Sequence, residues 1–221
     1  MKKIVYSLLF IFEIFALNAQ TTDTELWTDV NMGLRLSKKA DLDFEVAHRR
    51  DNNMGNSKVS FFSPSFSYEL TKKLDLGLGY RFSIMNGASN EQRLSMDLQY
   101  KFKIVKGLDF SYRLKVQNDW DNNGSKGAVV RNRIKLDYNL SKLVDPYVGF
   151  ELFLDTGAPE FEQNRYIFGL DFNLPKGMDI AVYYIYRDKY NVANPATIHV
   201  LGISYGLGTI KTKKKGKKDE D

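Results

Sequence analysis

The sequence contains no cysteine among its 221 residues, and beyond the N-terminal segment it has no long apolar run. A chain without cysteine can form neither disulfides nor thiolate metal sites. The absence of long apolar runs excludes later membrane helices, since a spanning helix needs about 20 apolar residues. If such a chain is exported, it either stays soluble or enters a membrane as a β-barrel.

The charge distribution excludes a strongly basic domain. The formal net charge is +5, but the N-terminal segment contributes +1 and residues 211–221 contribute +3. The body of the chain therefore carries a net charge of only +1. This gives nucleic-acid binding no support, and we expect no nucleic-acid partner.

The N-terminus has the pattern of a secretory signal peptide. Lys2 and Lys3 give a positive start, residues 4–17 form an apolar stretch, and Ala19 is the small residue before the cleavage site. We therefore expect the protein to be exported and this segment to be cleaved. The predicted organisation is a signal peptide at residues 1–19, a β-barrel at residues 20–210 and a charged, disordered tail at residues 211–221.

A short basic turn followed by an aspartate recurs about every 34 residues. The aspartates are Asp41, Asp75, Asp109, Asp145 and Asp179, spaced by 34, 34, 36 and 34 residues. A repeat of this length with alternating apolar and polar residues is typical of a two-stranded β-hairpin. Chained hairpins form an up-and-down antiparallel barrel. The sequence therefore predicts an all-β transmembrane barrel of about 10–12 strands; eleven can be read directly, and ten or twelve are considered because bacterial barrels usually have an even number.

The alternation separates an apolar face from a polar one. Residues 94–98, for example, read Leu-Ser-Met-Asp-Leu. Enclosing so many large apolar side chains would overfill a small barrel, so we expect them to face lipid over runs of about 9–11 residues. Aromatic residues near the strand ends are expected to form interfacial girdles. They are Trp27, Tyr68, Tyr100, Tyr138, Tyr166, Tyr186 and Tyr205.

The connections between predicted strands alternate in length. The lysine-bearing turns are short, whereas the intervening connections are longer and polar. This asymmetry is typical of outer-membrane barrels, whose short turns lie in the periplasm. A soluble periplasmic barrel that binds a hydrophobic ligand is the remaining all-β alternative.

Several short motifs resemble those of a known family. They are Glu45–Arg49, Gly79–Arg81, Arg131–Arg133, Glu151, Asn164–Arg165 and Tyr184–Arg187. In these motifs the sequence is similar to the family catalogued as domain of unknown function 2490, a set of bacterial outer-membrane β-barrels. The likeness covers about residues 25–207. It implies an outer-membrane barrel and brings no activity, substrate or catalytic residue with it, and the charged tail departs from the usual barrel ending.

Charged residues gather on the predicted inward face, and arginines outnumber carboxylates among them. One interpretation is a narrow path for small solutes with a preference for anions, because rings of arginine favour anions. The other is structural, with Arg–Glu pairs filling and cross-linking a narrow barrel, and it is the favoured one. The predicted lumenal set is Glu45, Arg49, Glu69, Arg81, Arg93, Arg113, Arg131, Arg133, Glu151, Arg165 and Arg187.

A lipid-acting enzyme of the hydrolase or acyltransferase type is the alternative from another class. His48 is expected to face outward near the long-loop end, and Ser60 of the next strand could lie opposite. A hydroxyl beside an imidazole is the minimum for an activated nucleophile. Neither His48 nor His199 has a serine two residues later, as barrel lipases do, so interfacial polar residues are the simpler interpretation. We assign no catalytic residue and no cofactor.

One loop matches half of a calcium-binding motif. Asp119, Asp121 and Asn123 have the spacing of the first ligands, followed by Gly124. The position of the bidentate glutamate is Val130, so a polar extracellular turn is the favoured interpretation.

Together these patterns predict a non-enzymatic barrel of the outer membrane, either structural or a narrow pore for small solutes. The expected partners are outer-membrane lipid, including lipopolysaccharide, and the barrel-assembly machinery during biogenesis. The lysine-rich tail could also contact anionic headgroups.

Overall fold

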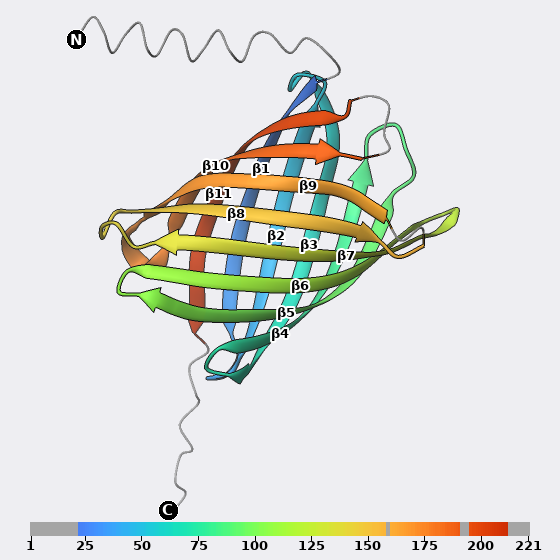
Figure 1. Cartoon of the computed structure of the whole chain (residues 1–221). Coiled ribbons are helices and arrows are strands. Elements are labelled where there is room, and N and C mark those ends of the chain that lie inside the picture. The colour runs from blue at the N-terminus through green and yellow to red at the C-terminus, as the bar shows by residue number, and fades with distance from the viewer. Residues whose placement is uncertain (1–21, 158–159, 191–194, 212–221) are drawn as a thin grey trace, which may run out of the picture.

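The computed structural model describes residues 22–157, 160–190 and 195–211, which form one closed barrel of eleven strands (Figure 1). The predicted signal peptide and almost all of the predicted tail lie outside these residues. Within the described part, no helix is both long and apolar enough to cross a bilayer. The strands are β1 (Thr22–Arg35), β2 (Ala40–Asp51), β3 (Asn56–Thr71), β4 (Leu74–Met85), β5 (Glu91–Val105), β6 (Leu108–Asp121), β7 (Gly124–Tyr138), β8 (Val144–Asp155), β9 (Glu160–Asn173), β10 (Asp179–Lys189) and β11 (Thr197–Lys211).

The barrel closes through an unusual pairing of its terminal strands. Each strand pairs antiparallel with its neighbour in sequence, whereas β1 and β11 pair in parallel. This follows from the odd strand number, because the first and last strands of an up-and-down meander then run in the same direction. The all-β barrel is confirmed, and all eleven strands seen in the sequence belong to the closed sheet, so neither ten nor twelve is correct.

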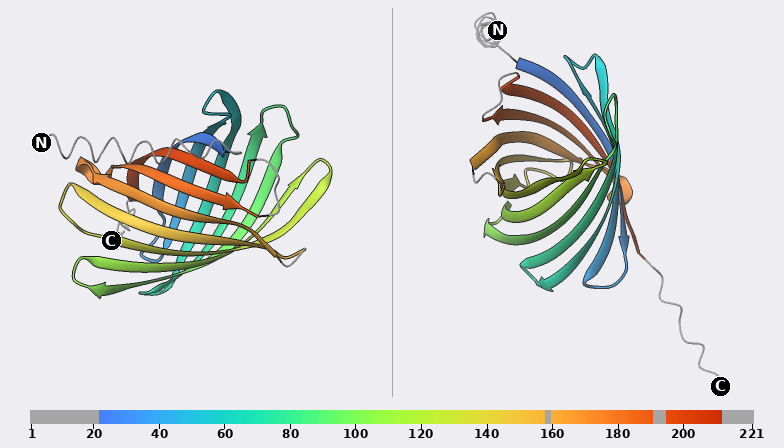
Figure 2. Two further views of the ribbon diagram at one scale, coloured as in Figure 1. Left: turned by 45° about the horizontal axis from the view of Figure 1, so that its top comes forward. Right: turned by 90° about the vertical axis from the view of Figure 1, so that its right-hand side faces the viewer.

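The two ends of the barrel differ in their connections. The short-turn end holds the lysine-bearing hairpins and the 3-10 turn η1 (Pro175–Gly177), where Lys176 and Gly177 adopt positive φ angles of 64° and 76°. The other end, called here the long-loop end, holds the connections that the sequence predicted to be longer. They span two to seven residues, against two to five at the short-turn end, so the predicted asymmetry is much smaller in the structure, because the strands extend into the segments expected to be loops. Both β1 and β11 start at the long-loop end and finish at the short-turn end. Figure 2 shows from two further directions how strongly the strands tilt around the barrel.

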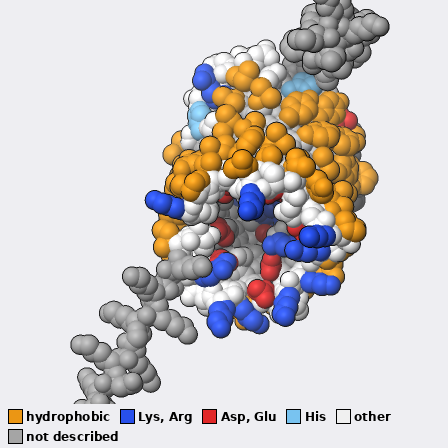
Figure 3. Space-filling model, turned by 90° about the vertical axis from the view of Figure 1, so that its left-hand side faces the viewer, with side chains coloured by type: hydrophobic (Ala, Val, Ile, Leu, Met, Phe, Trp, Pro, Cys, Tyr) orange, Lys and Arg blue, Asp and Glu red, His pale blue; other side chains and the backbone are white. Residues whose placement is uncertain are grey.

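Large apolar side chains cover the outer wall. Leu78, Leu94 and Met96 are 50%, 58% and 51% exposed, although all three lie within paired strands. Figure 3 shows hydrophobic side chains covering much of the outside around one hollowed end. In water this surface would be a very large exposed apolar patch, whereas a bilayer would cover it.

Aromatic side chains on the outer wall gather near both ends. Tyr100 and Phe102 are in contact near the short-turn end, with ring centroids 5.7 Å apart. Tyr166 and Tyr186 are in contact toward the long-loop end, with centroids 6.0 Å apart. These positions fit two interfacial girdles. The other predicted girdle tyrosines near the short-turn end are Tyr68, Tyr138 and Tyr205.

Trp27 does not belong to a girdle, and its assignment to one was wrong. Its side chain is 7% exposed and lies inside the barrel, packed with Ile185, Ile198 and Val200. It has the same strand parity as Glu25, which also faces inward. The interior therefore contains an apolar wall along β1, β10 and β11. The predicted division into an apolar outer face and a charged inner face did not include such a wall.

Candidate binding site in the barrel lumen

Strand register brings aromatic and cationic side chains to one level of the lumen. Tyr183 of β10 pairs with Gly202 of β11, Gly202 with Trp27 of β1, and Trp27 with Arg49 of β2. Because side chains alternate along a strand, paired residues share one face of the sheet. This inward row thus places Arg49 directly beside the apolar wall.

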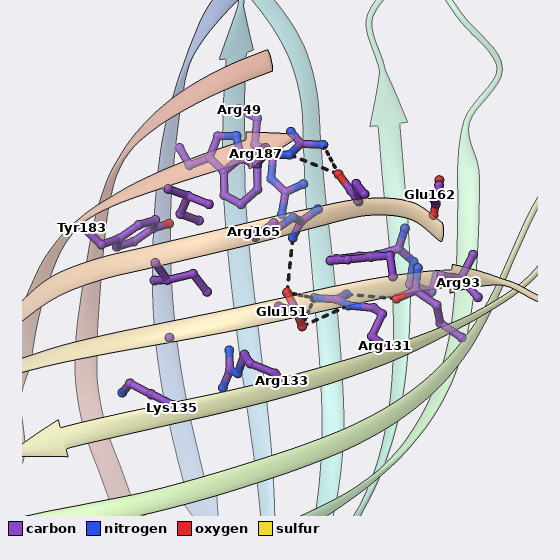
Figure 4. Close-up of a pocket in the computed structure, with 18 of the residues that line it drawn as sticks. Arg49, Arg93, Arg131, Arg133, Lys135, Glu151, Glu162, Arg165, Tyr183 and Arg187 are labelled. Atoms are coloured by element: carbon purple, nitrogen blue, oxygen red, sulfur yellow. Dashed lines mark hydrogen bonds and ion pairs between the residues drawn. The ribbon is translucent and has the colours of Figure 1, made fainter. Parts of the chain in front are cut away.

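These side chains line a cavity of about 460 Å³ (Figure 4). Its lining includes eight cationic side chains but only three carboxylates, so it carries a clear excess of positive charge. The cations are Arg49, Arg81, Arg93, Arg131, Arg133, Lys135, Arg165 and Arg187, and the carboxylates are Asp119, Glu151 and Glu162. We call it the cationic cavity.

Glu151 is the centre of the charge network. Its carboxylate lies 2.9 Å from Arg131, 3.1 Å from Arg113 and 3.6 Å from Arg165, and its side chain is 2% exposed. Figure 4 shows Arg131 and Arg165 both directed at this carboxylate. One negative charge therefore serves three guanidinium groups, and their charge is only partly neutralised.

A second buried carboxylate, Glu25, was missing from the predicted lumenal set. It accepts hydrogen bonds from the Trp27 indole at 2.6 Å, Lys58 at 2.7 Å and Arg187 at 3.2 Å. The signal was present in the sequence, because Glu25 has the inward parity of β1. Glu25 lies at the start of the first predicted strand, and for this reason parity alone did not indicate that it belongs to the lumenal charge network.

Arg49 and Arg133 differ from the other lumenal arginines. Neither has a hydrogen bond or an ion pair with any residue that the structure describes. The Arg49 guanidinium instead lies over the rings of Trp27, at 3.8 Å from the centroid, and Phe61, at 4.9 Å. Cation–π contacts of this kind cover the faces of the guanidinium and leave its N–H edge available. Both arginines line the cationic cavity.

The remaining predicted lumenal residues also lie on the inner face. Arg81 is 3.3 Å from Glu45, and Arg93 makes two hydrogen bonds to Asp119, of 2.5 and 2.6 Å. Glu69 alone stands apart from the cavities, half-buried near the short-turn end of β3. The structure thus brings ten of the eleven predicted residues around two adjoining cavities.

The second cavity has a volume of about 510 Å³ and lies toward the short-turn end. It shares Arg81 and Arg131 with the cationic cavity. Its charges are mixed, since Asp43, Asp75 and Asp97 lie among lysines and arginines. Figure 3 looks into this end, where acidic side chains lie within the hollow and Lys and Arg side chains surround it.

The candidate calcium ligands Asp119, Asp121 and Asn123 do not form a cation site in the structure. Asp119 is occupied by Arg93, Asp121 lies 3.5 Å from Lys126, and the backbone N–H of Asn123 donates to Asp121 at 2.7 Å. Among the described residues, no cluster of three or more His, Cys, Asp or Glu side chains could hold a metal ion.

His48 and Ser60 lie opposite each other on the outer wall, as the spacing predicted. His48 Nδ1 and Ser60 Oγ are 2.9 Å apart across the β2–β3 pair. His199 is bonded in the same way to the hydroxyl of Tyr184, at 2.6 Å. Neither histidine has a carboxylate partner among the described residues, so the third group that orients a catalytic imidazole is not found there.

The fold and the lumen together define a β-barrel with a charged, partly apolar interior. The chain belongs to the family described as Protein of unknown function (DUF2490), which it matches over residues 24–197. The resemblance seen in the short motifs is therefore confirmed. No curated protein matches the sequence.

Among solved structures, the chain is similar to an anion-selective porin from Comamonas acidovorans. The two share 12% sequence identity with a TM-score of 0.39, and the match covers 79% of this chain. It covers 53% of the porin, so the chain spans about half of that protein's length.

Proposed function

We propose that this protein is an outer-membrane β-barrel whose lumen takes up and passes small anions. The apolar outer wall and the two aromatic girdles support insertion in a bilayer. The longest connection between strands, residues 190–196, lies at the long-loop end, which supports an orientation with the short-turn end in the periplasm. A soluble barrel that stores a hydrophobic ligand would need its apolar side chains inside, whereas most of the large ones lie outside.

The observation that carries the anion preference is the pair of lumenal arginines without an acidic partner. A purely structural network would place an acceptor beside each guanidinium, because an unpaired buried charge is costly. Glu151 and Glu25 serve their arginines in this way, but Arg49 and Arg133 have no such acceptor among the described residues. We therefore favour passage of small anions over the purely structural role that the sequence favoured.

Planar-bilayer conductance of the purified protein tests this proposal. Under a KCl gradient we expect a reversal potential with the sign of the chloride equilibrium potential, because a cationic lumen lowers the barrier for anions. Arg49→Gln and Arg133→Gln should each shift the reversal potential toward zero. Arg50→Gln is the matched control, since Arg50 is exposed on the outer face beside Arg49. Absence of any current, or a preference for cations, would contradict the proposal.

We also infer that the barrel is not an enzyme. The backbone N–H groups beside Ser60 belong to a strand that is paired on both sides, so few donors are left to stabilise an oxyanion. An esterase assay on the detergent-solubilised protein checks this inference. Hydrolysis that disappears in a Ser60→Ala variant would show that the His48–Ser60 pair is catalytic.

A further inference from the structure

We infer that the cationic cavity selects small carboxylates that carry an apolar body, such as a saturated ring or a short branched chain. The inference rests on the proposed function in taking the lumen as an anion site, and it adds the chemical class of the anion. It is carried by the juxtaposition of unpaired guanidinium groups with an apolar wall inside one cavity.

Arg49 provides the charged side of this site. The guanidinium group of Arg49 lies over the aromatic rings of Trp27 and Phe61, and these contacts stabilise its position. Its N–H groups have no acceptor among the described residues, while the side chain lines the cavity. A guanidinium edge matches a carboxylate with two parallel hydrogen bonds. The recognition of a carboxylate at Arg49 therefore needs no rearrangement of existing ion pairs.

The wall of the cavity beside Arg49 is apolar. Ile167, Tyr183 and Ile185 line it, and all three pack with Trp27 in one hydrophobic cluster. Apolar side chains on the wall of a water-filled path give an inorganic ion nothing to bind. They do favour a solute whose apolar part leaves water against them.

Glycines on the adjacent strands make room for two tyrosines of the cavity wall. Tyr183 lies over Gly202 and Tyr147 lies over Gly169, each so close that a Cβ on the glycine would be within 2.3 Å of the ring. Glycine at these positions therefore lets the rings lie close against the barrel wall. The remaining volume of about 460 Å³ suits a small organic solute, because ligand cavities typically measure about 300–1,000 Å³.

Tryptophan fluorescence can report binding at this site. The chain has two tryptophans, Trp27 in the cavity wall and Trp120 on β6, so a Trp120→Phe variant leaves Trp27 as the single reporter. Cyclohexanecarboxylate is a suitable probe because it does not absorb where tryptophan is excited. Acetate, inorganic phosphate and the neutral cyclohexylmethanol serve as comparison probes, all at constant ionic strength.

We expect a saturable change in Trp27 fluorescence with cyclohexanecarboxylate at a concentration at least tenfold lower than with acetate or phosphate. Cyclohexylmethanol should produce no saturable change. Arg49→Gln should weaken the binding about tenfold, and Arg49→Lys should recover part of it. Arg50→Gln, on the outer face, should leave the binding unchanged. Tyr183→Ser should reduce the preference for cyclohexanecarboxylate over acetate.

Equal binding of acetate, phosphate and cyclohexanecarboxylate would overturn the inference, since the apolar wall would then play no part. Equal binding of cyclohexylmethanol would also overturn it, since charge would then be irrelevant. Both results are independent of the conductance measurement. An anion-selective current without this preference defeats the inference alone, whereas selective binding without any current defeats the proposed passage of anions.

Discussion

The ring of Tyr183 lies directly over Gly202 on the neighbouring strand, inside the barrel. A Cβ added at Gly202 would be 2.0 Å from two ring carbons of Tyr183, so no side chain fits there while the ring stays in place. The same relationship joins Tyr147 to Gly169 two strands further around the wall, where the distance would be 2.3 Å. Glycine thus serves as the surface on which each inward tyrosine rests, an arrangement known to stabilise glycines in sheets.

Replacing Gly202 by alanine should destabilise the barrel by about 1–3 kcal/mol, because the ring of Tyr183 must move from its place. Urea unfolding of the protein refolded in lipid or detergent measures the change. The matched variant is the double substitution of Gly202→Ala with Tyr183→Ala, which removes the ring that the new methyl group meets. We expect its loss to be smaller than the sum of the two single losses, as for residues in contact. Strictly additive losses would show that the ring does not occupy this place.

Replacing Glu151 by glutamine should destabilise the barrel by about 3–5 kcal/mol, because it leaves three largely buried guanidinium groups without their shared counter-charge. Glu45→Gln is a suitable comparison, since Glu45 pairs with the single arginine Arg81 at 3.3 Å and is itself 30% exposed. The loss for Glu45→Gln should be clearly smaller in the same unfolding experiment. Similar losses for both variants would mean that Glu151 does not hold the network together.

Much of the barrel could be predicted from local sequence patterns. The spacing of Asp41, Asp75 and Asp109 fixed the hairpin length, and the alternation of residues assigned Arg81 and Arg131 to the lumen. These features depend on two short-range properties, the period of two along a strand and the chemistry of the turns. The opposition of His48 and Ser60 also followed from counting residues across one hairpin.

The features that failed to follow from the sequence depend on relationships across the barrel. The parallel closure of β1 on β11 joins residues about 175 positions apart, such as Trp27 and Gly202, and no local pattern specifies it. Arg113 bonds to Glu151 two strands away, so the pairing of arginines depends on strand stagger as well as parity. The apolar wall was missed although residues 198–203 signal it, because both faces of that segment carry large apolar side chains.

An arginine on the outer wall should be costly in the middle of the barrel and cheap at its rim. Met96 is 51% exposed at the centre of the outer wall, and Val105 is 60% exposed at the short-turn end of β5. In a bilayer, Met96→Arg should lower the free energy of unfolding by about 2–4 kcal/mol, and Val105→Arg by about 0–1 kcal/mol. Unfolding from lipid vesicles measures both. A wall in contact with water would tolerate the two substitutions equally.

The parallel pairing of β1 and β11 predicts that the two ends of the barrel domain lie on opposite sides of the membrane. β1 begins at Thr22 at the long-loop end, and β11 finishes at Lys211 at the short-turn end. If the short turns face the periplasm, an epitope inserted directly before Thr22 should bind antibody on intact cells. An epitope placed after Lys211 should bind only after the outer membrane is permeabilised.

An epitope in the loop between β4 and β5 provides the control, since this loop lies at the same end as Thr22 and should be labelled with it. If only the epitope after Lys211 is labelled on intact cells, the barrel has the opposite orientation in the membrane, and the odd strand number still holds. Labelling of both ends together would require an even number of crossings. The parallel contact between β1 and β11 could then not close the barrel in the membrane, because the two strands would run in opposite directions.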